Sequence, residues 1–204
     1  KAGQMVTSED LKRMKRVLRR LEYISGDDVL KVKGKIACEI SASNELVVTE
    51  LLINGHFQKM EPEAIAAVCS CLVFSETKGD PVEPKNPILA DGYHKLVVIV
   101  KKVASVLIEC KVDINEEDFI NSFKPDLAEV TYKWCKGKKF EEVCKMTEVY
   151  EGTIIRCLRR LEELLRQLSL VAKTQLQNGD LHDKLEAASL KLKRGIVFAA
   201  SLYL

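Results

Sequence analysis

The sequence lacks the motifs on which nucleotide hydrolysis depends. Its 204 residues contain no G-x-x-x-x-G-K-[ST] loop, whose backbone amides bind phosphates, and no acidic strand end of the kind that holds magnesium in such enzymes. They also contain no apolar run near the roughly 20 residues that a membrane-spanning helix requires, and nothing resembles a signal peptide. These absences exclude a complete NTPase and predict no membrane contact.

The sequence also has little net charge and only three histidines. A formal net charge of +2 is too small to attract nucleic acid through a protein-wide field, so any such binding must depend on a local surface. The three histidines are scattered, and no serine or cysteine forms a recognisable motif around them. We therefore expect no catalytic residues in this chain.

The seven cysteines form an odd set and lie mostly within apolar helical patterns, which predicts reduced intracellular thiols. Cys69 and Cys71 stand two positions apart, so on a helix they point in different directions. No second pair follows at the spacing of a zinc site. We predict no metal site and no cofactor bound by this chain.

What the chain has is apolar residues at helical spacing, which predicts an all-α fold: a multi-helix bundle with at most one or two very short strands. The alternation Val29–Lys33 predicts one such strand, and the segment 75–87, rich in proline, predicts a loop whose role is open. The predicted helices run from Ser8, as N-cap, to about Tyr23, from Pro62 to Phe74, over about 89–111, from Pro125 to Trp134, over 140–145 and over about 153–175, with one or two more after Asn178.

The predicted helix 153–175 carries two opposed stripes when its residues are placed about 100° apart. Leucines, with Ile154 and Val171, gather on one broad face. The opposite side is polar and consists of Arg156, Arg160, Glu163 and Gln167.

Two interpretations of this polar stripe remain open. Arginine binds phosphates and stacks on exposed bases, and Glu or Gln can hydrogen-bond ribose hydroxyls, so the stripe could grip single-stranded RNA. Alternatively, it is a solvated face with intrahelical pairs, such as Arg159 with Glu163 and Glu162 with Arg166.

A second candidate surface is the first predicted helix, in which six of the nine residues from Lys12 to Arg20 are basic. This possible basic patch consists of Lys12, Arg13, Lys15, Arg16, Arg19 and Arg20. Contact with phosphates and contact with an acidic protein surface explain it equally well. Residues 140–160 also have the outline of a helix-turn-helix pair, but a DNA reader would carry more net positive charge.

Several stretches resemble the DSHCT domain found at the C-terminus of exosome-associated DExH-box RNA helicases. The resemblance extends over almost the whole chain from about Leu11 and is closest to the nuclear branch of that family. Its motifs are Leu30–Ile40, Ser122–Leu127, Cys144–Thr147, Glu151–Arg156, Arg160–Leu164 and Ile196–Leu204.

This resemblance implies how the chain is organised. Residues 1–43 would be the C-terminal part of a winged-helix domain, and residues 44–204 the DSHCT helical bundle with a ratchet-like helix at 153–175. Because the sequence starts at Lys1, we expect it to be part of a longer protein, with Leu204 as the natural C-terminus. ATP and Mg would be bound only by motor domains outside this chain.

The resemblance also implies a function: a non-catalytic domain that guides single-stranded RNA from the motor of an ATP-dependent 3′–5′ RNA helicase. The RNA-facing positions of the family match Arg160 and Glu163, whereas Arg156 and Gln167 join them by helical geometry alone. The implied partners are single-stranded RNA, the chain's own RecA-like motor domains, the RNA exosome and adaptor proteins. We expect a monomeric domain in the nucleus (nucleoplasm or nucleolus), with the cytoplasm as the alternative site. The competing hypothesis is an architectural or protein-docking module without RNA contact.

Overall fold

The computed structural model describes residues 7–76 and 79–199, and within these ranges the chain forms ten α-helices and one short 3-10 helix. The predicted all-α fold is therefore confirmed. The helices are α1 (Ser8–Arg20), α2 (Val32–Cys38), α3 (Glu45–Ile53), α4 (Pro62–Val73), α5 (Pro87–Glu109), α6 (Glu116–Asn121), α7 (Ala128–Cys135), α8 (Phe140–Cys144), α9 (Glu151–Thr174) and α10 (Gly179–Leu192), followed by the 3-10 helix η1 (Gly195–Phe198).

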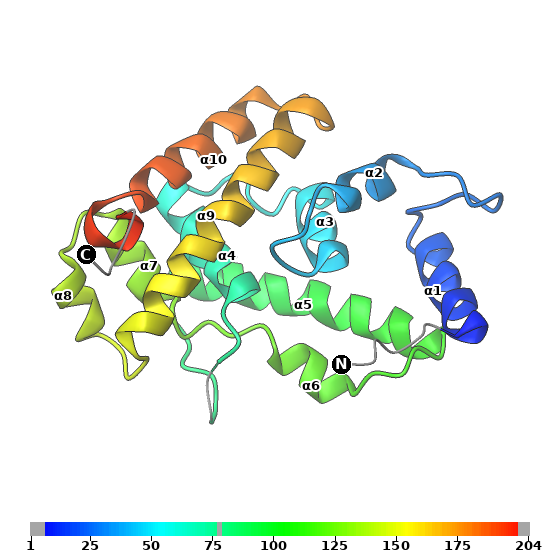
Figure 1. Cartoon of the computed structure of the whole chain (residues 1–204), viewed down its shortest axis with the longest axis horizontal. Coiled ribbons are helices and arrows are strands. Elements are labelled where there is room, and N and C mark those ends of the chain that lie inside the picture. Colours follow the sequence, from blue (N-terminus) through cyan, green and yellow to red (C-terminus); the bar gives the residue numbers. More distant parts are fainter. Residues whose placement is uncertain (1–6, 77–78, 200–204) are drawn as a thin grey trace.

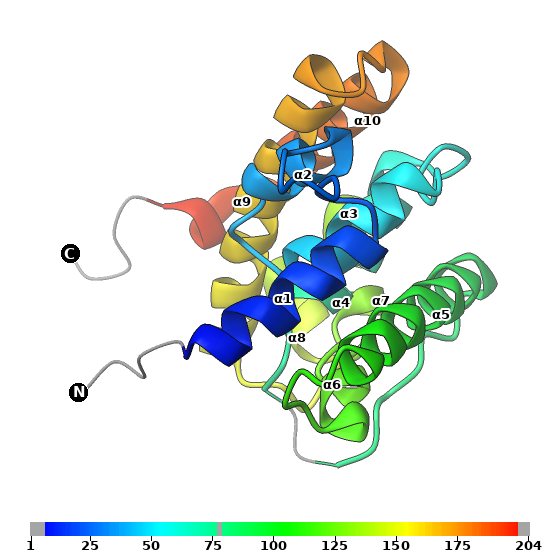
Figure 2. The ribbon, with the colours of Figure 1, turned by 90° about the vertical axis from the view of Figure 1, so that its right-hand side faces the viewer.

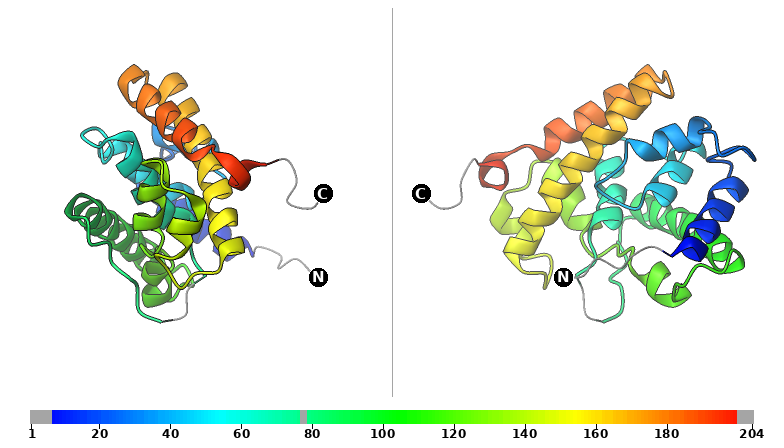
Figure 3. Two further views of the ribbon diagram at one scale, coloured as in Figure 1. Left: turned by 90° about the vertical axis from the view of Figure 1, so that its left-hand side faces the viewer. Right: turned by 45° about the vertical axis from the view of Figure 1, so that its right-hand side comes forward.

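Helix α4 forms the centre of the bundle. It packs against α5, α7, α9 and α10, and all of its residues except Pro62 are buried (Figure 1). A helix that is apolar on nearly every face can only be stable in such a position. The two views in Figure 3 show α9 and α10 lying side by side along one flank, with α5 on the opposite side of α4.

Asparagine side chains begin four of the helices. Asn44, Asn86, Asn115 and Asn178 each accept a hydrogen bond from a backbone amide of the following first turn, of α3, α5, α6 and α10 respectively. Each bond satisfies a donor that has no partner inside the helix. The polar breaks in the sequence therefore fix where the helices begin.

The start and the end of α1 differ from the prediction. Thr7, and not Ser8, is the N-cap: its hydroxyl accepts a hydrogen bond from the Asp10 amide, and the Asp10 carboxylate accepts one from the Thr7 amide. This reciprocal pair requires an acidic residue three positions after the cap, which Thr7 has. The helix ends at Arg20 because Glu22 adopts a left-handed conformation with φ of 65°.

The predicted strand at Val29–Lys33 is wrong. Within the described ranges, this segment contributes only an isolated antiparallel bridge between Leu30 and Ile24, and α2 already begins at Val32. The helical turn allows Gly34 to approach Tyr23 so closely that a Cβ atom would lie 2.3 Å from the Tyr23 carbonyl oxygen. It also buries Ile36 completely. Tertiary packing outweighs the alternating pattern here.

A buried carboxylate attaches this N-terminal segment to the bundle. Glu50 on α3 is 1% exposed and lies 2.6 Å from Lys33 Nζ and 3.4 Å from Lys102 Nζ on α5. The Tyr23 hydroxyl donates to the Leu46 carbonyl oxygen at 3.0 Å, and burial together with the neighbouring Glu50 raises the Tyr23 pKa, which keeps that donor protonated. Removing both lysines would leave the buried charge of Glu50 uncompensated.

Figure 2 shows the side of the molecule on which α1 lies, with α5 and α6 below it and α9 and α10 above. In the part of the chain that the structure describes, no helix combines the length and hydrophobicity needed to span a bilayer.

Candidate nucleic-acid interface

Helix α9 supplies a rigid base for the predicted polar stripe. The apolar side chains predicted for its inner face are all fully buried, namely Ile154, Leu158, Leu161, Leu164, Leu165, Leu168 and Val171. They pack mainly against α10 and α4. Burial of one such side chain contributes about 1.5–3 kcal/mol, so this face fixes both the position and the rotation of the helix.

Arg160 and Glu163 lie on the opposite, exposed face of α9. Arg160 Nε donates to the Ala42 carbonyl oxygen at 2.9 Å, which orients the side chain. Its two terminal nitrogens, and the Glu163 carboxylate, form no hydrogen bond with any residue that the structure describes. The stripe thus offers one arginine fork and one carboxylate, one turn apart, to an outside ligand.

Gln167, predicted as an RNA contact, is engaged in hydrogen bonds within the chain. It is half-buried, and its Oε1 accepts hydrogen bonds from the backbone amides of Ser41 (3.0 Å) and Ala42 (3.1 Å). Its Nε2 donates to Ser41 Oγ at 2.8 Å. Both the oxygen and the nitrogen of its side-chain amide are thus engaged. Gln167 therefore holds the loop between α2 and α3 against α9, and little of its hydrogen-bonding capacity remains for a ligand. No local pattern could have signalled this role, since its partners lie 126 and 125 positions earlier in the sequence.

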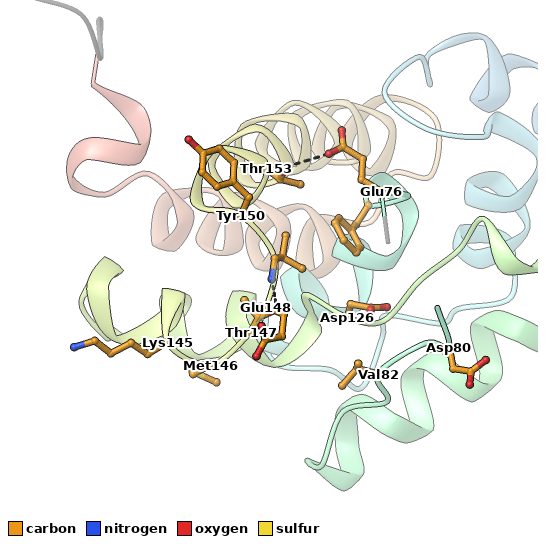
Figure 4. A pocket seen from close by; sticks show the side chains of 12 residues that line it. Glu76, Asp80, Val82, Asp126, Lys145, Met146, Thr147, Glu148, Tyr150 and Thr153 are labelled. Atoms are coloured by element: carbon orange, nitrogen blue, oxygen red, sulfur yellow. Dashed lines mark hydrogen bonds between the residues drawn. The ribbon is translucent and has the colours of Figure 1, made fainter. Parts of the chain in front are cut away.

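Arg156 is exposed but has an acidic neighbour in the loop after α4. Its Nη2 donates to Thr153 Oγ1 at 2.9 Å and lies 3.5 Å from Glu76 Oε2. The Thr153 hydroxyl in turn donates to Glu76 Oε2 at 3.1 Å (Figure 4). Glu76 therefore occupies the position from which an anion would approach Arg156.

The intrahelical pairs considered as the alternative are present only in part. Glu162 and Arg166 form the predicted pair at 3.0 Å, whereas the predicted Arg159–Glu163 pair is wrong. Arg159 instead donates to the carbonyl oxygens of Val197 (2.6 Å) and Ala199 (3.1 Å), beyond α10. Glu163 therefore remains exposed and unpaired among the described residues, so the stripe has one of the two expected intrahelical pairs and is otherwise open to solvent.

Most of the possible basic patch on α1 is neutralised within the chain. Arg13 lies near Glu9 and Asp10, at 3.8 and 3.7 Å, and Arg20 contacts Glu109 on α5. Only Lys12 and Arg16 are exposed without an acidic partner among the described residues.

The remaining two basic residues of α1, Lys15 and Arg19, both bind the carboxylate of Asp28. Lys15 Nζ donates to Asp28 at 3.0 Å, and Arg19 contacts the same side chain through two nitrogens. These hydrogen bonds lower the pKa of Asp28. Asp28 therefore ties α1 to the turn that precedes α2.

The cysteines and histidines do not form a metal or catalytic site. Among the described residues no group of three potential ligands lies close enough to hold a metal ion, and burial raises the pKa of Cys71, Cys135 and Cys157 to about 12. Thiols with such values are unreactive at neutral pH.

One cluster has the composition of a catalytic triad but not its geometry. The Ser169 hydroxyl contacts both His182 Nδ1 (2.9 Å) and Glu186 Oε1 (2.5 Å), so the serine and not the histidine lies at the centre. Ser169 is 3% exposed, and no substrate could reach it. The cluster joins α9 to α10.

Comparison with known proteins identifies the family. Residues 27–199 match the DSHCT (NUC185) domain family. The chain belongs to this family. The predicted resemblance is thereby confirmed.

The whole chain is also similar to parts of known helicases. It is 45% identical over its whole length to the human exosome RNA helicase MTR4, 46% identical over its whole length to the ATP-dependent RNA helicase mtr4 of Schizosaccharomyces pombe, and 46% identical over 96% of its length to the DExH-box ATP-dependent RNA helicase DExH9 of Arabidopsis thaliana. The chain spans only 19%, 18% and 20% of these proteins, respectively. The matched family region begins at residue 27 and so includes α2.

Proposed function

We propose that this DSHCT domain holds single-stranded RNA along the exposed face of α9 and belongs to an ATP-dependent 3′–5′ RNA helicase that acts with the exosome. Arg160 and Glu163 are the contact residues. The single observation that carries the proposal is that this pair stays open to solvent on a helix whose inner face is fully buried.

The chemistry of the pair suits a ribonucleotide strand. An arginine whose Nε is already held has a preoriented fork, which reduces the entropy lost when it binds a phosphate or stacks on a base. A carboxylate one turn away accepts a hydrogen bond from a ribose 2′-hydroxyl, which DNA lacks. We therefore assign Arg160 to phosphate or base contact and Glu163 to the ribose.

Arg156 joins the pair only when Glu76 releases it, and Gln167 serves as a positioning residue that holds the loop at Ser41. This assignment keeps two of the four predicted residues as direct contacts. The other two, Arg156 and Gln167, lie on the same face of α9, where Arg156 is a conditional contact and Gln167 a positioning residue.

In the proposed mechanism the DSHCT domain hydrolyses no ATP. ATP and Mg bind in motor domains outside this chain, and residues 1–43, of which the family match already covers 27–43, close a winged-helix domain that precedes the bundle. Arg160 and Glu163 retain the strand between power strokes, so that successive cycles give net movement in one direction. We place this activity in the nucleus, together with the exosome and its adaptor proteins.

The test uses the parent helicase with Arg160→Ala and Glu163→Ala combined. We expect unwinding of a duplex with a 3′ overhang to fall roughly tenfold, because a hydrogen bond to a charged group contributes about 1.5–3 kcal/mol. Lys101→Ala with Glu117→Ala, an exposed pair on α5 and α6, is the matched control and should retain full activity. Unwinding that is unchanged in the first variant would refute the proposal.

The second candidate function is an architectural or protein-docking module. It is favoured by the internal engagement of Arg156, Gln167 and four of the six basic residues on α1. If Arg160→Glu leaves RNA crosslinking of the parent intact while weakening its attachment to a partner protein, this second function holds.

A further inference from the structure

A groove runs along the loop between α4 and α5, on the side of the molecule where α9 begins. It consists of two adjoining cavities of about 610 and 340 Å³, which share Val82, Asp126 and Met146 in their walls. One wall is the loop after α4, and the other is the connection between α8 and α9 (Figure 4). No part of the proposed RNA face at Arg160 contributes to it.

The lining of this groove is acidic. Among the residues that the structure describes, the lining contains two lysines and six carboxylates, namely Glu76, Asp80, Glu83, Asp126, Glu129 and Glu148. Of the two lysines, Lys145 pairs with Glu141 at 2.7 Å, and Figure 4 shows its side chain directed away from the cavity. The groove is therefore a local negative surface on a chain whose net charge is slightly positive.

Some of these carboxylates already form hydrogen bonds or ion pairs within the chain, and others do not. Glu83 lies 3.1 Å from His94 Nε2, and Glu129 accepts a hydrogen bond from the Asn86 amide at 2.6 Å. Asp80 and Glu148 are exposed and form no hydrogen bond or ion pair with any described residue. These two, one on each wall, are available to a cationic ligand.

Apolar side chains line the groove beside the two available carboxylates: in the view of Figure 4, Val82 lies between Asp80 and Glu148, and Met146 lies beyond Glu148. Val82 is 66% exposed and Met146 is 40% exposed, although both line the groove. Tyr150, 76% exposed, stands at one end. Flexible methionine surfaces accommodate apolar anchors of varied shape, and an aromatic side chain adds contact area at low entropic cost.

We propose that this groove binds an extended peptide segment of a partner protein, in which basic residues flank an apolar side chain. The apolar residue packs on Val82 and Met146, and lysines or arginines on either side pair with Asp80 and Glu148. Charge complementarity selects this occupant, because the same carboxylates repel the phosphates of a nucleic acid. The groove adjoins the RNA face at Glu76, which pairs with Arg156, but it does not depend on the proposed RNA contact at Arg160 and Glu163.

The test measures binding of a fluorescein-labelled, C-terminally amidated peptide with two leucines between two pairs of lysines. We expect saturable binding that falls at least tenfold for Asp80→Lys combined with Glu148→Lys, and about threefold for Met146→Ser. The matched control, Asp113→Lys with Asp183→Lys, makes the same charge change at exposed residues outside the groove and should alter binding less than twofold.

Three outcomes would overturn the proposal. One is an equal loss in the control and groove variants. A second is equal binding of a peptide in which serine replaces both leucines, which would indicate attraction by charge alone. The third is direct binding of a uridine-rich RNA oligonucleotide to the unsubstituted groove, seen as perturbation of the Met146 methyl signal by the RNA alone. Amide spectra that match the parent protein show that each variant is folded, and perturbation of the Met146 methyl signal by the peptide locates the binding independently of any substitution.

Discussion

Helices α1 and α9 both carry arginines on one side, but they make opposite use of them. Helix α1 has six basic residues within nine positions, and four of these contact carboxylates of the same chain. Helix α9 has fewer cations on its outer face, yet Arg160 keeps its terminal nitrogens available and Glu163 is unpaired among the described residues. The density of charge in a sequence therefore does not measure the charge that is available to a ligand.

The two helices also differ in how firmly they are held. Val17 is the only buried residue of α1, whereas twelve residues of α9 are buried. A contact residue can retain a moving strand only if its own helix does not yield, so the packing of α9 is a condition of the proposed function.

The largest expected effect comes from the packing of α9. Leu161→Ala should lower the free energy of unfolding by about 2–5 kcal/mol, because it leaves a cavity in the fully buried face. Val17→Ala on α1 should cost clearly less, since it removes fewer carbon atoms and Val17 is the only buried residue of its helix. Urea denaturation measures both, and equal losses would contradict the contrast between the helices.

The next effect concerns RNA affinity. Arg160→Glu in the parent helicase should weaken binding of single-stranded RNA roughly tenfold or more, and should reduce the slope of log K against log salt by about 0.7 for each phosphate that the variant no longer neutralises. Arg16→Glu makes the same charge change at an exposed residue of α1 that has no acidic partner among the described residues. It should change affinity less than twofold. A similar loss in both variants would make α1 part of the RNA site.

The sequence predicts those parts of this contrast that depend on neighbouring residues, and it does not predict those that depend on residues far apart in the chain. The helices, their asparagine caps and the buried face of α9 are local or periodic patterns, and most of the helices and that face were predicted from them, although α6 and the start of α2 were not. The neutralisation of α1 was not, because Arg20 meets Glu109 from α5, and Lys15 and Arg19 meet Asp28 beyond the turn. Glu76 beside Arg156 was missed for the same reason. Periodicity identifies the exposed side of a helix, but it does not show which distant residue covers it.

The next prediction is a smaller effect, an increase in the affinity of α9 for RNA. Glu76→Gln keeps the side-chain volume but removes the charge that lies 3.5 Å from Arg156, and so releases this arginine for a phosphate. RNA affinity should rise by up to about fivefold, since an exposed ion pair is worth at most about 1 kcal/mol. The same substitution combined with Arg156→Ala should show no gain. A gain that persists in the double variant would mean that Glu76 repels RNA directly and does not compete for Arg156.

The smallest effect tests whether Asp28 holds α1 in place. Hydrogen bonds from Lys15 and Arg19 hold the pKa of Asp28 below its ordinary value of 3.8. The folded state therefore binds this proton less readily than the unfolded state, so the contribution of Asp28 to stability is complete above pH 3.8 and is lost as the pH falls through the lowered value.

Hydrogen exchange of the α1 amides, measured relative to those of α9, should accelerate over that acidic range in the parent chain. In Asp28→Asn, exchange in α1 should already be faster at neutral pH and should show no further step on acidification, while exchange in α9 stays the same. Identical profiles for the two proteins would mean that the contact of Val17 with the bundle suffices to hold α1, and that its paired cations do not restrain it.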